Sequence, residues 1–112
     1  METKEAVKKL LTDAKKLIRK GWTFSDYARD KDGTSVYFYQ PEACRFCSVG
    51  AMKRATLDNN FGNCVYENAY TYLGAAVREV NGNANVVAFN DAPNRKKKEV
   101  LDVFSKAISS IG

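Results

Sequence analysis

Apolar residues recur every three or four positions along several stretches of the chain, which is the spacing of helices with one buried face. In residues 4–20 the apolar positions are Val7, Leu10, Leu11, Ala14, Leu17 and Ile18. Lysine and arginine crowd the last turns of this stretch, where the helix dipole favours cations. We therefore predict a helix over 4–20 that ends at Gly21, with this glycine in a left-handed conformation.

A second helix is predicted to begin at Pro41, because proline suits the first helical position, and its apolar spacing continues to Ala55. Its inner face contains Gly50 and Ala51, which are small enough to let another backbone approach closely.

Two further helices are predicted in the second half of the chain. One covers about 64–81, with Asn63 as its cap and Gly82 as its end. The other covers 95–111, with Asn94 as its cap.

Residues 22–40 lack helical spacing. A turn signal around Gly33 separates 26–29 from 35–39, so we predict a short β-hairpin from these two segments. The apolar run 86–89 is either a strand or a buried connector. The chain is therefore predicted to be one α+β, mainly α domain over 1–112. About four helices pack on one core, with the hairpin and one candidate extra strand.

The composition, with 45% hydrophobic and 28% charged residues, is that of an ordinary globular protein. No apolar run reaches the roughly 20 residues of a membrane span, and the N-terminus has no apolar signal segment. Three cysteines are an odd number for a disulfide framework, which favours reduced thiols. We therefore expect a cytoplasmic protein.

The chain contains no histidine, which is the commonest general base and metal ligand. A Ser-His-Asp or Cys-His arrangement is therefore excluded within one chain. The sequence also has no Gly-rich phosphate loop and no paired-carboxylate motif. These absences favour a protein that is not an enzyme, with no cofactor and no bound metal.

Four short motifs occur in order along the chain. They are Gly21-Trp22; Ala28-Arg29-Asp30 with Gly33; Arg45-Phe46-Cys47 with Gly50-Ala51 and Arg54-Ala55; and Phe89-Asn90-Asp91-Ala92-Pro93. In these motifs the chain resembles a family of small bacterial and bacteriophage domains of unknown function, over roughly residues 7–108. The resemblance implies a bacterial or phage origin and assigns no chemistry.

The most site-like polar pair is Asn90-Asp91. Arg45 and Arg54 of the second predicted helix are candidates to lie beside it, so these four residues form a candidate binding cleft. Asparagine and aspartate also cap turns readily, and a purely structural role is the alternative.

A basic surface is the second candidate site. Four cations open the last predicted helix, where they oppose its dipole, and three more lie on the first helix. They are Arg95, Lys96, Lys97 and Lys98, together with Lys15, Lys16 and Arg19. If the two helices lie side by side, this surface could hold nucleic acid, which the net charge of +5 permits. A solvated, salt-screened face is the alternative.

Cys44 and Cys47 have the C-x-x-C spacing, with Cys64 as a further thiol. A metal would need a fourth ligand, and a redox role would need a helix start that lowers the thiol pKa. The alternative is that Cys47 packs in the core as a small apolar residue.

Three functional hypotheses are open at this point. The first is a non-catalytic module that binds an unidentified protein partner, in a phage as a host-takeover or anti-defence factor. The second is a nucleic-acid-binding accessory protein that uses the basic surface. The third is a small enzyme or metal protein that uses Cys47 and Asp91.

Overall fold

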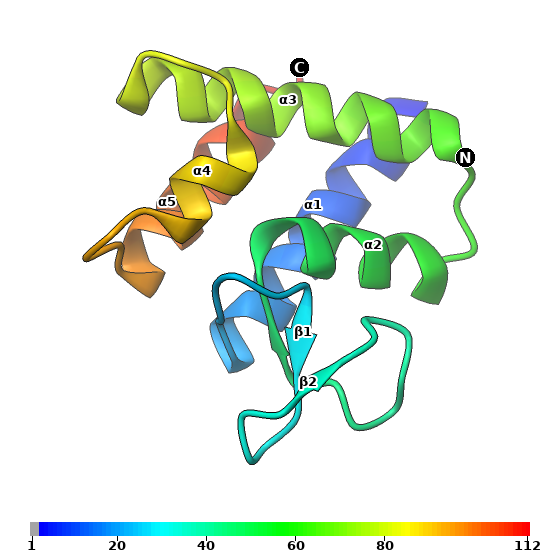
Figure 1. The fold of residues 1–112 in the computed structure, drawn as a ribbon. Coiled ribbons are helices and arrows are strands. Elements are labelled where there is room, and N and C mark those ends of the chain that lie inside the picture. Colours follow the sequence, from blue (N-terminus) through cyan, green and yellow to red (C-terminus); the bar gives the residue numbers. More distant parts are fainter. Residues whose placement is uncertain (1–2) are drawn as a thin grey trace.

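A computed structural model of the chain describes residues 3–112 (Figure 1). In chain order its elements are α1 (Thr3–Lys20), β1 (Ala28–Arg29), β2 (Ser35–Val36), β3 (Arg45–Phe46), α2 (Ser48–Asp58), α3 (Asn63–Asn81), α4 (Val86–Asp91) and α5 (Lys97–Ser109). The predicted α+β, mainly α class is confirmed, with five helices in this range where about four were predicted. None of the helices in residues 3–112 is long and apolar enough to cross a membrane.

The first helix forms the centre of the core. α1 contacts α2, α3 and α5, and its apolar stripe is buried against them. The predicted stripe is confirmed at Val7, Leu10, Leu11, Ala14 and Ile18, all of which are buried. The helix ends as predicted, at Lys20. The predicted left-handed conformation of Gly21 is wrong: among the glycines of residues 3–112, positive φ occurs at Gly33 and Gly82.

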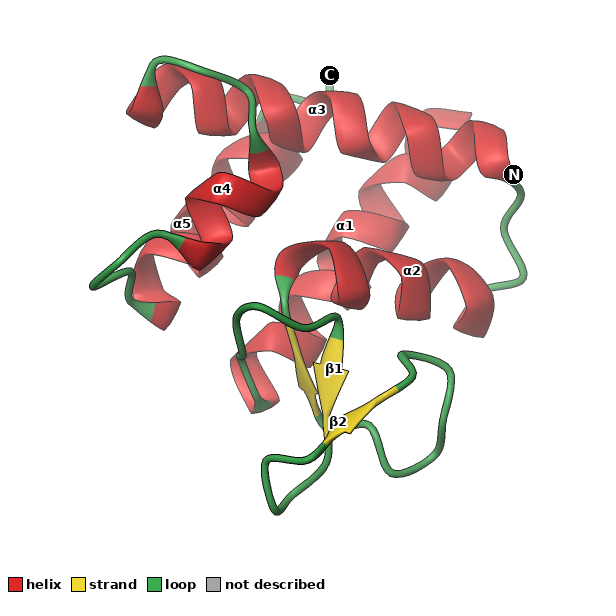
Figure 2. Ribbon diagram, in the orientation of Figure 1, coloured by secondary structure: helices red, strands yellow, loops and turns green. Residues whose placement is uncertain are grey.

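Three two-residue strands form a small antiparallel sheet at one end of the helices, in the order β2-β1-β3 (Figure 2). The predicted hairpin is present in shortened form, with Ala28 opposite Val36. The third strand, β3, was not predicted, and it pairs with the other edge of β1.

The second helix begins seven residues later than predicted, at Ser48 rather than Pro41. The chain before α2 is extended because the backbone of Phe46 forms hydrogen bonds with the segment after α1. The N–H of Phe46 donates to the Gly21 carbonyl at 3.0 Å, and the N–H of Thr23 donates to the Phe46 carbonyl at 3.1 Å. Cys47 then caps α2, since its Sγ accepts from the N–H of Gly50 at 3.3 Å.

Two predicted caps are also corrected. Gly62 is the cap residue of α3, and Asn63 is the first residue of the helix. Gly82 ends α3 in a left-handed conformation, as predicted. Asn94 lies in the preceding turn with φ of 65°, and α5 begins three residues after it.

The apolar run 86–89 is helical and forms most of α4, so the prediction of a strand was wrong. The side chain of Asn85 accepts from the N–H of Ala88 at 2.9 Å and caps the helix. This short helix ends in Asn90 and Asp91 and brings both toward α2 and the segment before β1 (Figure 1).

Candidate functional site

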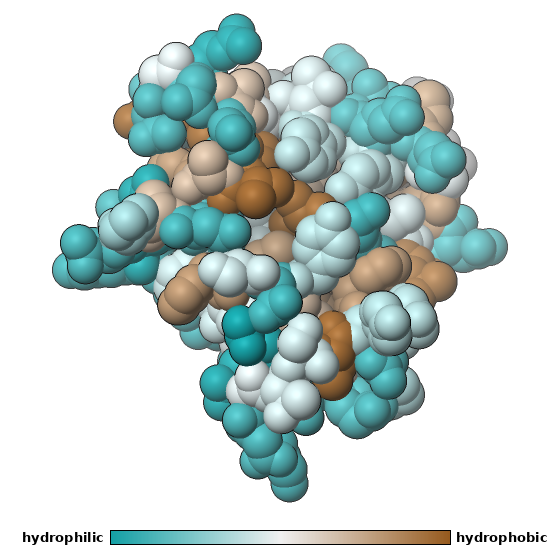
Figure 3. All heavy atoms as spheres, in the orientation of Figure 1, coloured by the Kyte–Doolittle hydropathy of each residue, from teal (hydrophilic) through white to brown (hydrophobic). Residues whose placement is uncertain are grey.

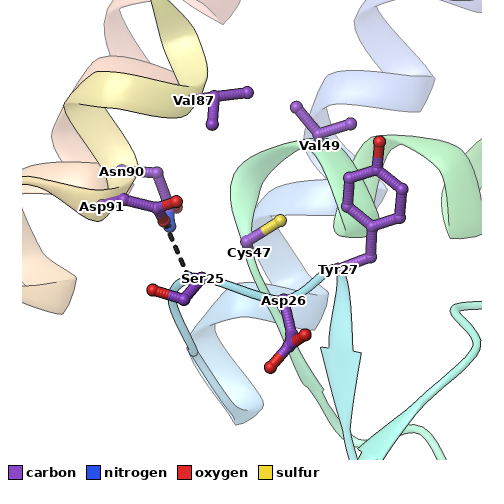
Figure 4. A pocket seen from close by; sticks show the side chains of 8 residues that line it. All are labelled: Ser25, Asp26, Tyr27, Cys47, Val49, Val87, Asn90 and Asp91. Atoms are coloured by element: carbon purple, nitrogen blue, oxygen red, sulfur yellow. Dashed lines mark hydrogen bonds between the residues drawn. The ribbon is translucent and has the colours of Figure 1, made fainter.

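A pocket of about 260 Å³ lies between α4, the start of α2 and the segment that leads into β1 (Figure 4). Its lining residues are Ser25, Asp26, Tyr27, Cys47, Val49, Val87, Asn90 and Asp91. Asn90 and Asp91 lie on the α4 side, facing Cys47, Val49 and Tyr27 across the hollow. In the space-filling view, apolar side chains gather on this face in the region between α4 and α2 (Figure 3).

Asn90 is the polar centre of this region and is 1% exposed. Its Oδ1 accepts from Trp22 Nε1 at 3.1 Å and from the N–H and Oγ of Ser48 at 3.0 and 2.8 Å. Its Nδ2 donates to the Thr23 carbonyl at 3.2 Å and to Asp91 Oδ1 at 2.9 Å. Both amide hydrogens are therefore used, and Asn90 ties α4 to α2 and to the segment after α1.

Asp91 is partly buried at the edge of the pocket. Its Oδ1 accepts from the backbone N–H of Ser25 at 3.0 Å as well as from Asn90. Ser25 has a φ of 68°, a left-handed conformation that costs a non-glycine residue about 1–2 kcal/mol. The carboxylate thus helps to hold a strained residue at the pocket, and such strain clusters at binding and active sites.

The other walls of the pocket are mostly apolar. Val49 is buried, whereas Tyr27 and Val87 are about half exposed. The second carboxylate, Asp26, is paired with Arg29 at 2.5 Å, so its charge is offset within the chain.

The thiol of Cys47 reaches the pocket but is 8% exposed. Burial raises the pKa of the Cys47 thiol, and the nearby Asp91 carboxylate raises it further, against backbone hydrogen bonds that lower it. The reactive form of cysteine is the thiolate, so this environment makes a poor nucleophile. Within residues 3–112 there is also no group of three histidine, cysteine, aspartate or glutamate side chains that could hold a metal ion.

We expect iodoacetamide to modify Cys44 and Cys64 in the folded protein, because both are exposed, and to leave Cys47 unmodified until the chain is unfolded. Mass spectrometry of the intact protein and its peptides, before and after denaturation, measures this. Modification of Cys47 at the rate of the two exposed thiols would restore the hypothesis of a reactive cysteine.

The four residues of the predicted cleft do not come together. Arg45 is exposed and donates to the Lys31 carbonyl at 3.0 Å. Arg54 donates to the carbonyls of Phe38 and Gln40 at 2.9 and 3.1 Å, and it pairs with a carboxylate one helical turn away. Of the four, the pocket contains only Asn90 and Asp91.

Residues 2–110 match a protein family described as a family of unknown function (DUF6197). The chain belongs to this family. No curated protein and no solved structure matches the chain. The resemblance to small domains of unknown function is therefore confirmed, and a bacterial or phage origin stays a prediction.

In this DUF6197 domain, the motifs that carried the resemblance contribute three of the eight lining residues of the pocket, together with glycines that pack the elements beside it. A Cβ on Gly21 would lie 2.3 Å from the Cys44 carbonyl oxygen, so glycine allows the segment after α1 to pass close to β3. A Cβ on Gly50 would lie 1.9 Å from the Tyr27 carbonyl oxygen, so glycine also allows α2 to pack against the pocket segment. These glycines therefore position Tyr27 and the start of α2.

The pocket walls were missed by the sequence analysis apart from Cys47, Asn90 and Asp91. Ser25 and Tyr27 lie in a segment without periodicity, and Val87 lies in a run too short to distinguish a strand from a helix. The one available signal was Asn85, a good cap residue directly before that run, which favours a helix.

The predicted basic surface is partly assembled. The ammonium group of Lys97 donates to the Arg19 carbonyl, so the end of α1 and the start of α5 lie together. Lys16 and Lys96 are exposed, and Lys15 is partly buried.

Two of the cations at the start of α5 are held by the chain itself. Arg95 lies 3.7 Å from the ring centroid of Phe89 and pairs with Glu99 at 3.3 Å, while Lys98 pairs with an aspartate one turn away. Glu99 also accepts from the N–H of Lys96 at 2.9 Å, a bond that lowers the pKa of the Glu99 carboxyl. Carboxylates of the chain itself thus compensate for the unfavourable placement of cations at the N-terminal end of the α5 dipole, and no phosphate is needed. Nucleic-acid binding stays a prediction.

Proposed function

We propose that the protein is a non-catalytic binding module that receives one side chain of a protein partner in the pocket between α4 and α2. The observation that carries the proposal is an open pocket with apolar walls and one carboxylate that has no cation partner among residues 3–112. Its volume of about 260 Å³ is below the roughly 300–1,000 Å³ of typical cofactor and small-molecule sites, so it suits one side chain.

The surroundings of the pocket also suit a protein partner. Tyr27 and Val87 are 51% and 47% exposed, and Phe24, next to Ser25, is 53% exposed. Aromatic and aliphatic side chains around a concave point are typical of the energetic centre of protein interfaces. In a bacterium or phage, such a module would act by occupying a surface of another protein.

The polar groups of the pocket favour binding over catalysis. Asn90 has both amide hydrogens committed to the fold, the Cys47 thiol is buried with a raised pKa, and the chain has no histidine to act as a base. The pocket therefore contains no activated nucleophile and no histidine base, and its free carboxylate, Asp91, has no nucleophile beside it to activate.

A peptide selection tests the proposal. Random peptides displayed on phage are selected against the wild-type protein, and their affinities are then measured for Val87→Trp and Val80→Trp. Both valines are exposed on helices, but only Val87 lines the pocket. We expect Val87→Trp to fill the pocket and weaken the selected peptides at least about tenfold, while Val80→Trp leaves them unchanged. Peptides that bind Val87→Trp as tightly as the wild type would refute the proposal.

A further inference from the structure

We infer that the partner side chain taken by this pocket is basic, a lysine or an arginine whose charged group is bound by Asp91. The inference rests on the proposed function and adds the chemistry of the occupant. The observation behind it is that one oxygen of the Asp91 carboxylate accepts no hydrogen bond within the described residues.

An ionised carboxylate has about four acceptor positions. Oδ1 of Asp91 accepts from Ser25 and Asn90, whereas Oδ2 accepts no hydrogen bond from the part of the chain that the structure describes. Among residues 3–112, Asp91 also has no cation within ion-pair distance. This carboxylate therefore has a free oxygen that can accept a charge-assisted hydrogen bond from a bound cation.

The charge of the lining has one sign. Two of its eight residues are carboxylates and none is lysine or arginine. Since Arg29 offsets Asp26, the negative charge that remains belongs to Asp91. Lys53 lies 5.8 Å from the Tyr27 ring centroid, but it also contacts the ring of Tyr66 and is not part of the lining. Although the whole chain has a net charge of +5, the lining of this pocket is negative and is therefore complementary to a basic side chain of a partner.

The apolar walls suit the stem of the same side chain. Lysine and arginine bury their methylene groups along apolar surface while the charged head keeps polar contacts. Val87 and Val49 provide such a surface, and Tyr27 adds an aromatic ring that can accept a cation on its face. A lysine or arginine entering past Val87 would therefore contact apolar groups along its stem and Asp91 at its end (Figure 4).

The test compares two small probes that differ in one charged group. N-acetyl-lysine N-methylamide and N-acetyl-norleucine N-methylamide are titrated into the ¹⁵N-labelled protein and followed by NMR. We expect the lysine probe to bind the wild type at least about tenfold more tightly, because hydrogen bonds to charged groups are the stronger ones. In Asp91→Asn, which keeps an oxygen for Ser25 but loses the charge, the two affinities should become equal.

Asp102→Asn is the matched control, since it removes an exposed carboxylate on α5 and should leave the preference for lysine intact. Equal affinities of the two probes for the wild type would overturn the inference, whatever the variants show. If both probes bind equally and both are lost in Val87→Trp, the basic occupant is refuted and the proposed function stands. If neither probe shows pocket-dependent binding and the selected peptides ignore Val87→Trp, both fall.

Discussion

Replacing Asn90 by alanine is expected to lower the free energy of unfolding by about 3–5 kcal/mol. The substitution removes five hydrogen bonds and leaves the indole N–H of Trp22 and both donors of Ser48 without their acceptor. Buried donors that lose a partner carry their full desolvation cost, which is why the expected loss exceeds that of an ordinary hydrogen bond. Urea denaturation followed by circular dichroism measures the change.

Asn85→Ala is the matched control, because this asparagine also bonds a backbone N–H but is exposed and acts only as a helix cap. Its loss should cost about 1 kcal/mol. If the two variants were destabilised equally, Asn90 would not be the hub that joins α4 to α2, and the pocket would lack the rigid frame described here.

The second large effect is expected at Gly50. Alanine at this position would place its Cβ 1.9 Å from the Tyr27 carbonyl oxygen, a backbone atom that can move only if α2 or the pocket segment moves. We expect Gly50→Ala to lower the free energy of unfolding by more than about 3 kcal/mol, or to prevent folding. The same denaturation experiment measures it.

Gly74→Ala provides the control, since its Cβ would meet its nearest neighbour at an ordinary 3.5 Å. This glycine lies in the interior of α3, where alanine is the better helix former by about 0.8–1 kcal/mol, so the variant should be as stable as the wild type or more so. A Gly50→Ala protein of wild-type stability would contradict the close packing of α2 on Tyr27.

The helices with strong local patterns could be predicted from the sequence. The stripe of α1 and the stop at Gly82 each depend on residues close in the chain, and the structure confirms both. The small inner face at Gly50 was also recognised as a place of close approach, although its contact, the Tyr27 carbonyl, was not.

The start of α2 could not be predicted, because a distant contact decides it. Pro41 is compatible with a first helical turn, but Phe46 bonds instead to Gly21 and Thr23, more than 20 positions earlier in the chain. No local pattern in residues 41–47 indicates that Phe46 forms these backbone hydrogen bonds. The missed strand β3 has the same cause.

The candidate site was predicted in part for a similar reason. Asn90 and Asp91 were recognised as a polar pair in a family motif, and they do lie at the pocket. Their neighbours were assigned by residue type alone, which favoured Arg45 and Arg54. The structure brings Ser25 and Val87 there instead, through a strained loop and an unpredicted helix.

The most direct test of the account is an NMR titration of the ¹⁵N-labelled wild type with one of the selected peptides. We predict that the largest changes in amide chemical shift occur at Ser25, Cys47, Val87 and Asp91, on the three segments that enclose the pocket. Two other surfaces could bind a partner: the exposed, stacked rings of Tyr37 and Tyr39, and the basic surface where α1 meets α5. Largest changes on either of them would show that the partner binds elsewhere and would contradict the account.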